Sequence, residues 1–206
     1  MYTPPAFAEH DPATLGALIA AFPLGLLITA GPGGVMANPL PFTLVHQDDR
    51  RLLRAHLARA NPQLAELAAA PQVLVVFQPG DAYVSPGLYP SKAETHKVVP
   101  TWNYAIVQVR GPARLDDSAA FLRPQIEALT TQQEAARAEP WAVSDAPEPF
   151  IAAQMRGIMG LEIEVQQIEG KLKLSQNRTA ADRAGVRTGM IAEGEPLARL
   201  MPDPNA

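Results

Sequence analysis

Short apolar or alternating runs, separated by glycine and proline turns, recur along the first 110 residues, as they do in β-strands. The pattern predicts strands over 24–30, 35–45, 50–57, 72–78, 82–85 and 102–110. A turn over Gly31–Gly34 joins the first two as a hairpin, and Pro39 and Pro41 favour a sheet edge for the second. We also expect a turn at Pro79–Asp81, and the last of these strands to end at Gly111–Pro112.

Helical signals gather at the start of the chain and in its second half. Asp11 before Pro12 predicts a capped helix that runs to about Phe22, and Asn61 before Pro62 predicts a second, shorter helix. Three further helical segments are expected at about 117–137, 148–159 and 179–190. The proline-rich end from residue 195 is expected to be a mobile tail.

This order of elements predicts a mainly β fold with helices, a β-barrel of the α+β kind, formed as a single domain over residues 1–206. The sequence has no βαβ series, no G-x-G-x-x-G after a strand and no Walker loop. The usual signatures of dinucleotide and nucleoside triphosphate binding are therefore absent.

The amino-acid composition excludes several classes of function for this chain. Hydrophobic residues make up 47% of the chain and charged residues 18%, as in folded globular proteins. The net charge of −4 argues against direct nucleic-acid binding and against an anionic membrane surface. The absence of cysteine excludes disulfides and thiolate chemistry and fits the cytoplasm, and we expect a soluble protein without a signal peptide or membrane span. The four histidines lack metal-ligand spacing, so no metal site is expected.

Three clusters of basic and amide residues are candidates for binding. The first runs from Arg51 to Asn61 and holds three arginines and His56 without an acidic residue. Cations at a strand end beside a helix start suit a phosphate group. A solvated strand face followed by an ordinary helix cap would look the same, so this cluster alone does not establish a site.

The second cluster lies before and within the predicted strand 102–110. It contains Ser85, Tyr89, Ser91, Lys92, Lys97, Thr101, Trp102 and Asn103. Strand alternation puts Trp102 and Tyr104 on one face and Asn103 on the other. We expect the aromatic face to be core, which leaves Asn103 on the opposite face, able to hydrogen-bond a planar heterocycle.

The third cluster, "KLKLSQNRT", surrounds Gln176 and Asn177 with Lys171, Lys173 and Arg178. An alternative interpretation is that these residues form the N-terminal cap of the last helix. An anionic, ring-bearing ligand needs such groups from several elements, so the three clusters together favour a ligand site more than each does alone.

Several segments resemble PaiB-type FMN-binding proteins, a family also labelled negative transcriptional regulators. The resemblance rests on "HLARANPQ", "VPTWNY", "EPWAVSDAP" and "KLSQNR" and covers nearly the whole chain. The chain departs from the family pattern at Asn38–Pro41, where a histidine is common, and at Leu88, where a tryptophan is common.

The resemblance implies an FMN-binding split β-barrel with a helical C-terminal half, and a homodimer that holds FMN in clefts at the subunit interface. Carried over residue by residue, it implies cofactor contacts at His56, Arg59, Asn61, Lys92, Thr101, Trp102, Asn103, Gln176, Asn177 and Arg178. No catalytic base can be named. The functions left open are a flavin-dependent oxidoreductase of unknown substrate, a transcriptional regulator acting directly or indirectly, and a binder of another planar anion such as haem or a deazaflavin.

Overall fold

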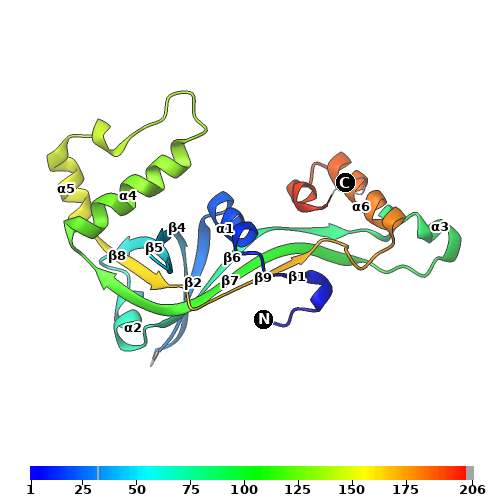
Figure 1. Cartoon of the computed structure of the whole chain (residues 1–206), viewed down its shortest axis with the longest axis horizontal. Coiled ribbons are helices and arrows are strands. Elements are labelled where there is room, and N and C mark those ends of the chain that lie inside the picture. The colour runs from blue at the N-terminus through cyan, green and yellow to red at the C-terminus, as the bar shows by residue number, and fades with distance from the viewer. Residues whose placement is uncertain (32, 203–206) are drawn as a thin grey trace. The chain divides into compact units, whose positions relative to one another are not determined.

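A computed structural model describes residues 1–31 and 33–202 (Figure 1). Over this part of the chain there are six α-helices: α1 (Pro12–Ala21), α2 (Gln63–Ala69), α3 (Ser91–Thr95), α4 (Ala119–Glu134), α5 (Glu148–Arg156) and α6 (Ala180–Ala192). The strands are β1 (Ala8–Glu9), β2 (Leu24–Gly31), β3 (Gly34–Pro41), β4 (Thr43–Gln47), β5 (Arg50–Ala58), β6 (Gln72–Val84), β7 (Thr101–Asp116), β8 (Ile158–Glu164) and β9 (Gln167–Lys173). The fold is thus mainly β with helices, as predicted.

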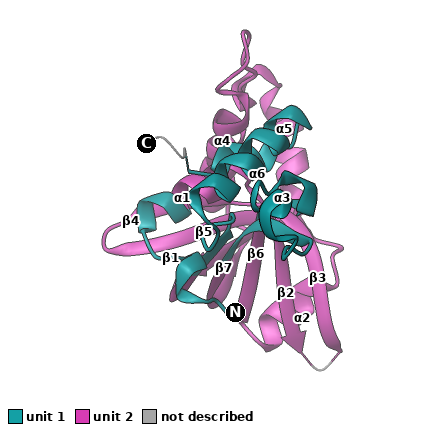
Figure 2. Cartoon of the chain, turned by 90° about the vertical axis from the view of Figure 1, so that its right-hand side faces the viewer, with its two compact units in different colours: residues 1–15, 78–107, 169–206 teal, residues 16–77, 108–168 magenta. Residues whose placement is uncertain are grey.

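The chain forms two compact units, shown in different colours in Figure 2. Unit 1 comprises residues 1–15, 78–107 and 169–206, and unit 2 comprises residues 16–77 and 108–168. Strands β6 and β7 each begin in one unit and end in the other. None of the helices in the described part of the chain has the length and hydropathy of a membrane-spanning segment.

Unit 2 is built on an antiparallel sheet with the strand order β3-β2-β6-β7-β8-β5-β4. Within the described residues this sheet does not close on itself. Strand β3, which carries Pro39 and Pro41, lies at an edge, as predicted, where a missing N–H breaks no ladder on the outer side.

The core of unit 2 follows the predicted alternation. Leu53, Ala55 and Leu57 of β5 are buried, and Ala55 lies opposite the buried Leu161 of β8. Phe42 and Phe77 pack edge to face with their ring centroids 5.7 Å apart. Burial of these side chains stabilises the sheet on which the candidate residues of unit 2 are carried.

In unit 1, β9 pairs with β1 and with β7. Helix α6 covers a core that includes Val84, Ala105 and Met190. Leu197 and Met201 are also buried in this core, beyond a short 3-10 helix at Pro196–Leu200. The expected mobile tail is therefore wrong for the segment up to Met201, because its apolar side chains pack; residues 203–206 lie outside the described part.

Two predicted chain breaks are also wrong. Strand β6 runs without interruption through Pro79–Asp81, because the fixed φ of proline is compatible with an extended strand. Strand β7 continues past Gly111 and Pro112 to Asp116. At Gly111 the carbonyl oxygen of Glu164 occupies the space that a Cβ would take, so glycine here permits a close approach of two backbones rather than a turn.

Candidate functional site

Arg59 follows directly after β5 in unit 2, and its side chain is 40% exposed. Its Nε donates to the carbonyl oxygen of Arg156 at 2.9 Å, and its Nη2 lies 3.0 Å from Oδ2 of Asp117. These groups line a hollow of about 220 Å³ with Leu122 and Met155. The guanidinium is thus held at the surface of a small hollow, where an anion can compete with Asp117 for it.

His56 lies three residues earlier, on the partly exposed face of β5 opposite Gly160 of β8. Its Nδ1 is 2.7 Å from Oε1 of Gln125, a buried residue of α4. Asn61 lies in the turn before α2, where its Oδ1 accepts from the backbone N–H of Gln63 at 3.0 Å. The structure thus places the three predicted residues of unit 2 on one strand end and the turn that follows it.

The side chain of Gln63 connects this turn to the edge hairpin. It is fully buried, its Nε2 donates to the carbonyl oxygen of Leu27 at 3.1 Å, and its Oε1 accepts from Asn38 at 3.0 Å. Asn38, one of the departures from the family pattern, therefore has a structural role beneath α2 in this chain.

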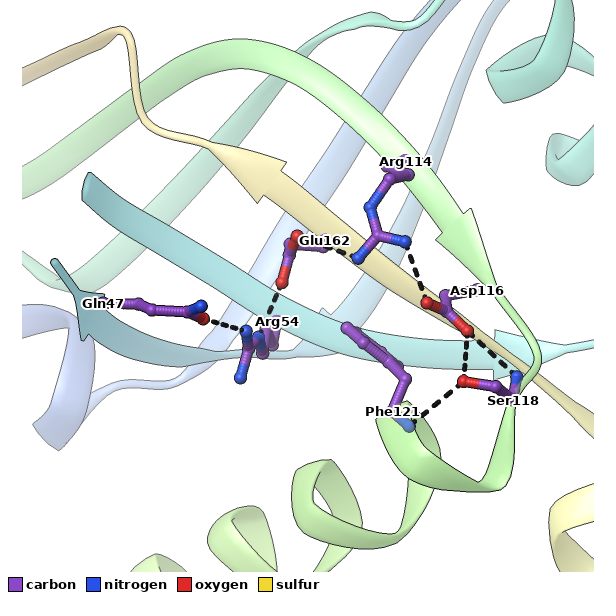
Figure 3. Close-up of polar contacts among 7 residues, drawn as sticks. All are labelled: Gln47, Arg54, Arg114, Asp116, Ser118, Phe121 and Glu162. Atoms are coloured by element: carbon purple, nitrogen blue, oxygen red, sulfur yellow. Dashed lines mark hydrogen bonds and ion pairs between the residues drawn. The ribbon is translucent and has the colours of Figure 1, made fainter.

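Two of the three arginines of the first cluster are paired with acidic residues: Arg59 with Asp117 in the loop after β7, and Arg54 with an acidic residue of a neighbouring strand (Figure 3). Arg54 lies 2.8 Å from Glu162 of β8, and Glu162 also pairs with Arg114 of β7. Arg114 in turn pairs with Asp116 at 2.8 Å. The sequence could not reveal this compensation, which depends on the register of three strands.

The hydrogen bonds of Asp116 and Ser118 extend this network to the first turn of α4. Ser118 caps the helix by accepting from the backbone N–H of Phe121, and the Phe121 ring lies 5.5 Å from the guanidinium carbon of Arg54. Two hydrogen bonds from Ser118, and a further one from Arg114, lower the pKa of Asp116 to about 2. Asp116 therefore keeps its charge, and its contacts, well below the ordinary range of a carboxyl group.

We expect Asp116 to contribute to acid stability. A carboxyl group whose pKa is lower in the folded state stabilises above its unfolded pKa of 3.8, and that contribution is lost as pH falls toward 2. Asp116→Asn should remove this part of the loss between pH 4 and pH 2, which for one proton is at most about 1.4 kcal/mol per pH unit. Urea titrations at several pH values measure it. Asp49→Asn, in an exposed turn, is the control; identical pH profiles for wild type and Asp116→Asn would contradict the assignment.

In unit 1, Lys173 of β9 reaches the start of β7. Its Nζ donates to Oγ1 of Thr101 at 2.7 Å and to the carbonyl oxygen of Trp102. Lys171 and Lys173 both approach the ring of Tyr104, at 5.2 Å and 5.9 Å from its centroid. Burial lowers the pKa of Lys173, and the charges of Arg178 and Lys171 lower it further. Three cations that repel one another in this way form a suitable setting for an anion.

The predicted orientation of β7 is wrong. Trp102 is 53% exposed, whereas Asn103 is fully buried and exchanges hydrogen bonds with Ser175 at 3.1 Å. Asn103, Ala105 and Val107 form the face of β7 that points into the core. A buried amide is tolerated at Asn103 because Ser175 satisfies its hydrogen bonds. Asn103 thus stabilises unit 1 from within its core.

The outward face of β7 forms one side of a hollow of about 530 Å³. Trp102, Tyr104 and Ile106 line it with Lys171, and Gln78 and Asp81 of β6 supply polar groups at its margin. Tyr83 lies edge-on to Trp102, with the ring centroids 5.9 Å apart. An apolar, aromatic hollow beside a lysine is chemically suited to a planar ring with an anionic group.

The remaining predicted residues of unit 1 are distributed around this region. Gln176 closes the turn after β9, accepting from the N–H of Leu174 at 2.6 Å. Arg178 lies over the ring of Tyr89, 5.0 Å from its centroid, while Asn177 and Lys92 are exposed. Lys92 lines a separate hollow of about 430 Å³ with Tyr89 and His96. Thr101 and Trp102 therefore share a contact with Lys173, whereas no such contact is recorded for Lys92 within the described residues.

Sequence reasoning missed Gln125 and Asp117, which contact His56 and Arg59 from α4 and from the loop before it. No motif marks either residue, and only the packing of α4 on the sheet brings them there. Among the described residues, no group of histidine and acidic side chains is placed to hold a metal ion.

Comparison with known proteins decides the family. Residues 1–167 match the family model described as "Putative FMN-binding domain". The chain belongs to this family. A protein of Emericella nidulans, itself uncharacterized, is 34% identical over 225 residues, which cover 92% of this chain and 90% of that protein. Protease synthase and sporulation protein PAI 2 of Bacillus subtilis is 29% identical over 98% of this chain and 94% of its own.

Solved structures agree on the fold. The FAD and heme binding protein of Mycobacterium smegmatis superposes with a TM-score of 0.58 at 19% identity, covering 81% of this chain and 73% of that one. The predicted split-barrel fold class and the resemblance to PaiB-type proteins are thus confirmed. The family match also supports FMN as the cofactor.

Proposed function

We propose that this protein binds FMN and uses it as the redox group of an oxidoreductase whose substrate is unknown. The observation that carries the proposal is the placement of His56 and Arg59 at the end of β5, in a chain that belongs to an FMN-binding family. A guanidinium and a protonated imidazole are both strong donors to a phosphate monoester.

Taken by itself, each unit carries residues with the chemistry that one part of FMN needs. In unit 2, Arg59 and His56 would bind the phosphate, with Asn61 holding the turn between β5 and α2. In unit 1, Trp102 lines an apolar hollow that would accept a ring. The proposal of polar contacts from Thr101, Lys92, Gln176, Asn177 and Arg178 rests on the family resemblance, since none of these residues lines that hollow. The fully buried Asn103 would act by holding Ser175. When bound, FMN supplies the electron transfer, while the protein orients it and limits access of water.

An FMN titration tests the proposal. We expect purified protein to retain FMN through dialysis with a Kd of about 1 μM or tighter, whereas riboflavin, which lacks the phosphate, should bind at least about tenfold more weakly. Visible absorbance of the retained flavin and quenching of tryptophan fluorescence measure both ligands. Equal affinity for the two flavins would contradict a phosphate site, and no retention of either would contradict flavin binding. Haem, added in the same assay, tests the alternative of another planar anion.

We further propose a cytoplasmic homodimer with the cofactor clefts at the subunit interface. Its support is the exposure of large apolar side chains, including Tyr83 and Trp102 on unit 1, which association would cover. Light scattering of the purified protein determines the mass in solution; a monomer at all concentrations would contradict this proposal.

A regulatory role is the second candidate, favoured by the similarity to protein PAI 2 of Bacillus subtilis. The net charge of −4 favours an indirect role over direct DNA binding. Salt-dependent, sequence-selective binding of DNA by the pure protein would instead establish a direct one.

A further inference from the structure

Gln125 is a buried polar residue whose hydrogen bond within the described chain goes to His56. It lies on α4, its side chain is 2% exposed, and its Oε1 is 2.7 Å from Nδ1 of His56. The adjacent core position on the same helix is Leu122, which is buried at 1%. An amide thus occupies a place in the interface between α4 and the sheet where apolar side chains otherwise pack.

A glutamine at this buried position is unfavourable for the free energy of folding. Its Nε2 is buried without a hydrogen-bond partner among the described residues. An unsatisfied buried donor costs about 1–3 kcal/mol, and an apolar side chain of similar size would avoid that cost. The contact with His56 is therefore the feature that explains glutamine at this position.

The contact also fixes the chemistry of the imidazole. An amide oxygen only accepts hydrogen bonds, so a hydrogen bond between Oε1 of Gln125 and Nδ1 of His56 requires the proton on Nδ1. In the neutral ring, Nε2 then holds the lone pair, on the opposite edge from Gln125. His56 is partly exposed, so Nε2 is the ring nitrogen available to a ligand.

We propose that Gln125 is a positioning residue for the FMN site: it holds His56 as the Nδ1–H tautomer and directs Nε2 to the phosphate. This inference rests on the proposed FMN binding. Because a neutral Nε2 cannot donate to a phosphate oxygen, Nε2 takes up one proton from solvent on binding. The resulting imidazolium donates through Nδ1 to Gln125 and through Nε2 to the phosphate, and no other bond changes.

The charged groups on the surrounding elements leave this role to Gln125. Several of them are joined in ion pairs: Arg54 and Arg114 with Glu162, Arg114 with Asp116, and Arg59 with Asp117. The same strands also carry Arg50, Arg51, Arg110 and Glu164, for which no ion pair is recorded within the described residues. On α4, Arg123 pairs with Glu127. Within the described residues, the hydrogen bond recorded for the His56 ring is the one to the neutral amide.

The first test needs no flavin. Long-range ¹H–¹⁵N correlation spectra of the ligand-free protein identify which imidazole nitrogen is protonated, and His56→Gln assigns the signal. We expect Nδ1–H in wild type and in Gln125→Glu, which keeps the acceptor oxygen, and loss of this preference in Gln125→Met. An Nε2–H tautomer in the wild type would overturn the inference whether or not the protein binds FMN.

The second test measures FMN affinity in the same variants. Gln125→Met should raise the Kd for FMN about tenfold, Gln125→Glu should bind as tightly as wild type or more tightly, and riboflavin affinity should not change. The midpoint of thermal unfolding of Gln125→Met should stay constant or rise, since an unsatisfied donor is removed. Gln133→Met, the same change at an exposed position of α4, is the control.

The possible failures are distinguishable. If wild type does not bind FMN, the proposed function fails while the tautomer measurement still stands on its own. If wild type binds FMN but Gln125→Met binds it equally well, the positioning role is overturned. A lower unfolding midpoint of Gln125→Met with unchanged FMN affinity would show that the amide serves folding alone.

Discussion

Arg59→Gln is expected to raise the Kd for FMN by about tenfold to a hundredfold, because a hydrogen bond to a charged group contributes about 1.5–3 kcal/mol. The Arg59 side chain is 40% exposed and its contacts are with Asp117 and the backbone of Arg156, so the loss should appear in binding rather than in folding. Titration of retained flavin, with the unfolding midpoint of each variant, separates the two.

Two further variants test whether the effect of Arg59→Gln is specific to a phosphate site. Asp117→Asn removes the carboxylate that competes with the phosphate for Arg59, so it should bind FMN more tightly than wild type. Arg137→Gln changes an arginine that is 66% exposed and pairs with Glu134, and it should bind like wild type. Equal weakening by Arg59→Gln and Arg137→Gln would mean that net charge, rather than a phosphate site, determines affinity.

Gly111→Ala is expected to lower the free energy of unfolding by about 3 kcal/mol or to prevent folding of unit 2. A Cβ at this position would lie 1.8 Å from the carbonyl oxygen of Glu164 and 3.3 Å from the backbone nitrogen of Gln166. These are backbone atoms of a paired segment, so no side-chain rotation relieves the overlap. Urea unfolding followed by circular dichroism measures the change.

Gly16→Ala is the matched control in the same unit. Gly16 lies within α1, and a Cβ there would meet only the side chain of Leu44 at 3.4 Å. Alanine should stabilise by about 0.5–1 kcal/mol, because glycine is the weaker helix former. If Gly111→Ala were as well tolerated as Gly16→Ala, the close approach of β7 to the end of β8 would be wrong.

Local signals in the sequence located most elements. Pro12 and Thr179 mark the starts of α1 and α6, and Pro39 and Pro41 mark an edge strand. These assignments succeeded because each depends on the chemistry of one residue and its near neighbours. At Gly111 and Pro79 the sequence predicted chain breaks that are absent, because the contacts of the surrounding strands determine the conformation there.

The candidate site was predicted less completely than the fold. Arg59 and His56 could be named from the basic cluster at a strand end and from the family resemblance, but their partners, Asp117 and Gln125, come from distant segments without a motif. The face of β7 was assigned incorrectly, because alternation indicates that Trp102 and Asn103 lie on opposite faces and does not indicate which face is buried.

The sequence by itself determined the family, the mainly β class of the fold and the position of the basic segment along the chain, since these follow from residue order and local conformational preference. Only the tertiary structure decided which of the cations are neutralised by ion pairs, that Asn103 is a core residue, and which nitrogen of His56 is engaged. These properties depend on strand register and on the packing of α4, and so on contacts between residues far apart in the chain.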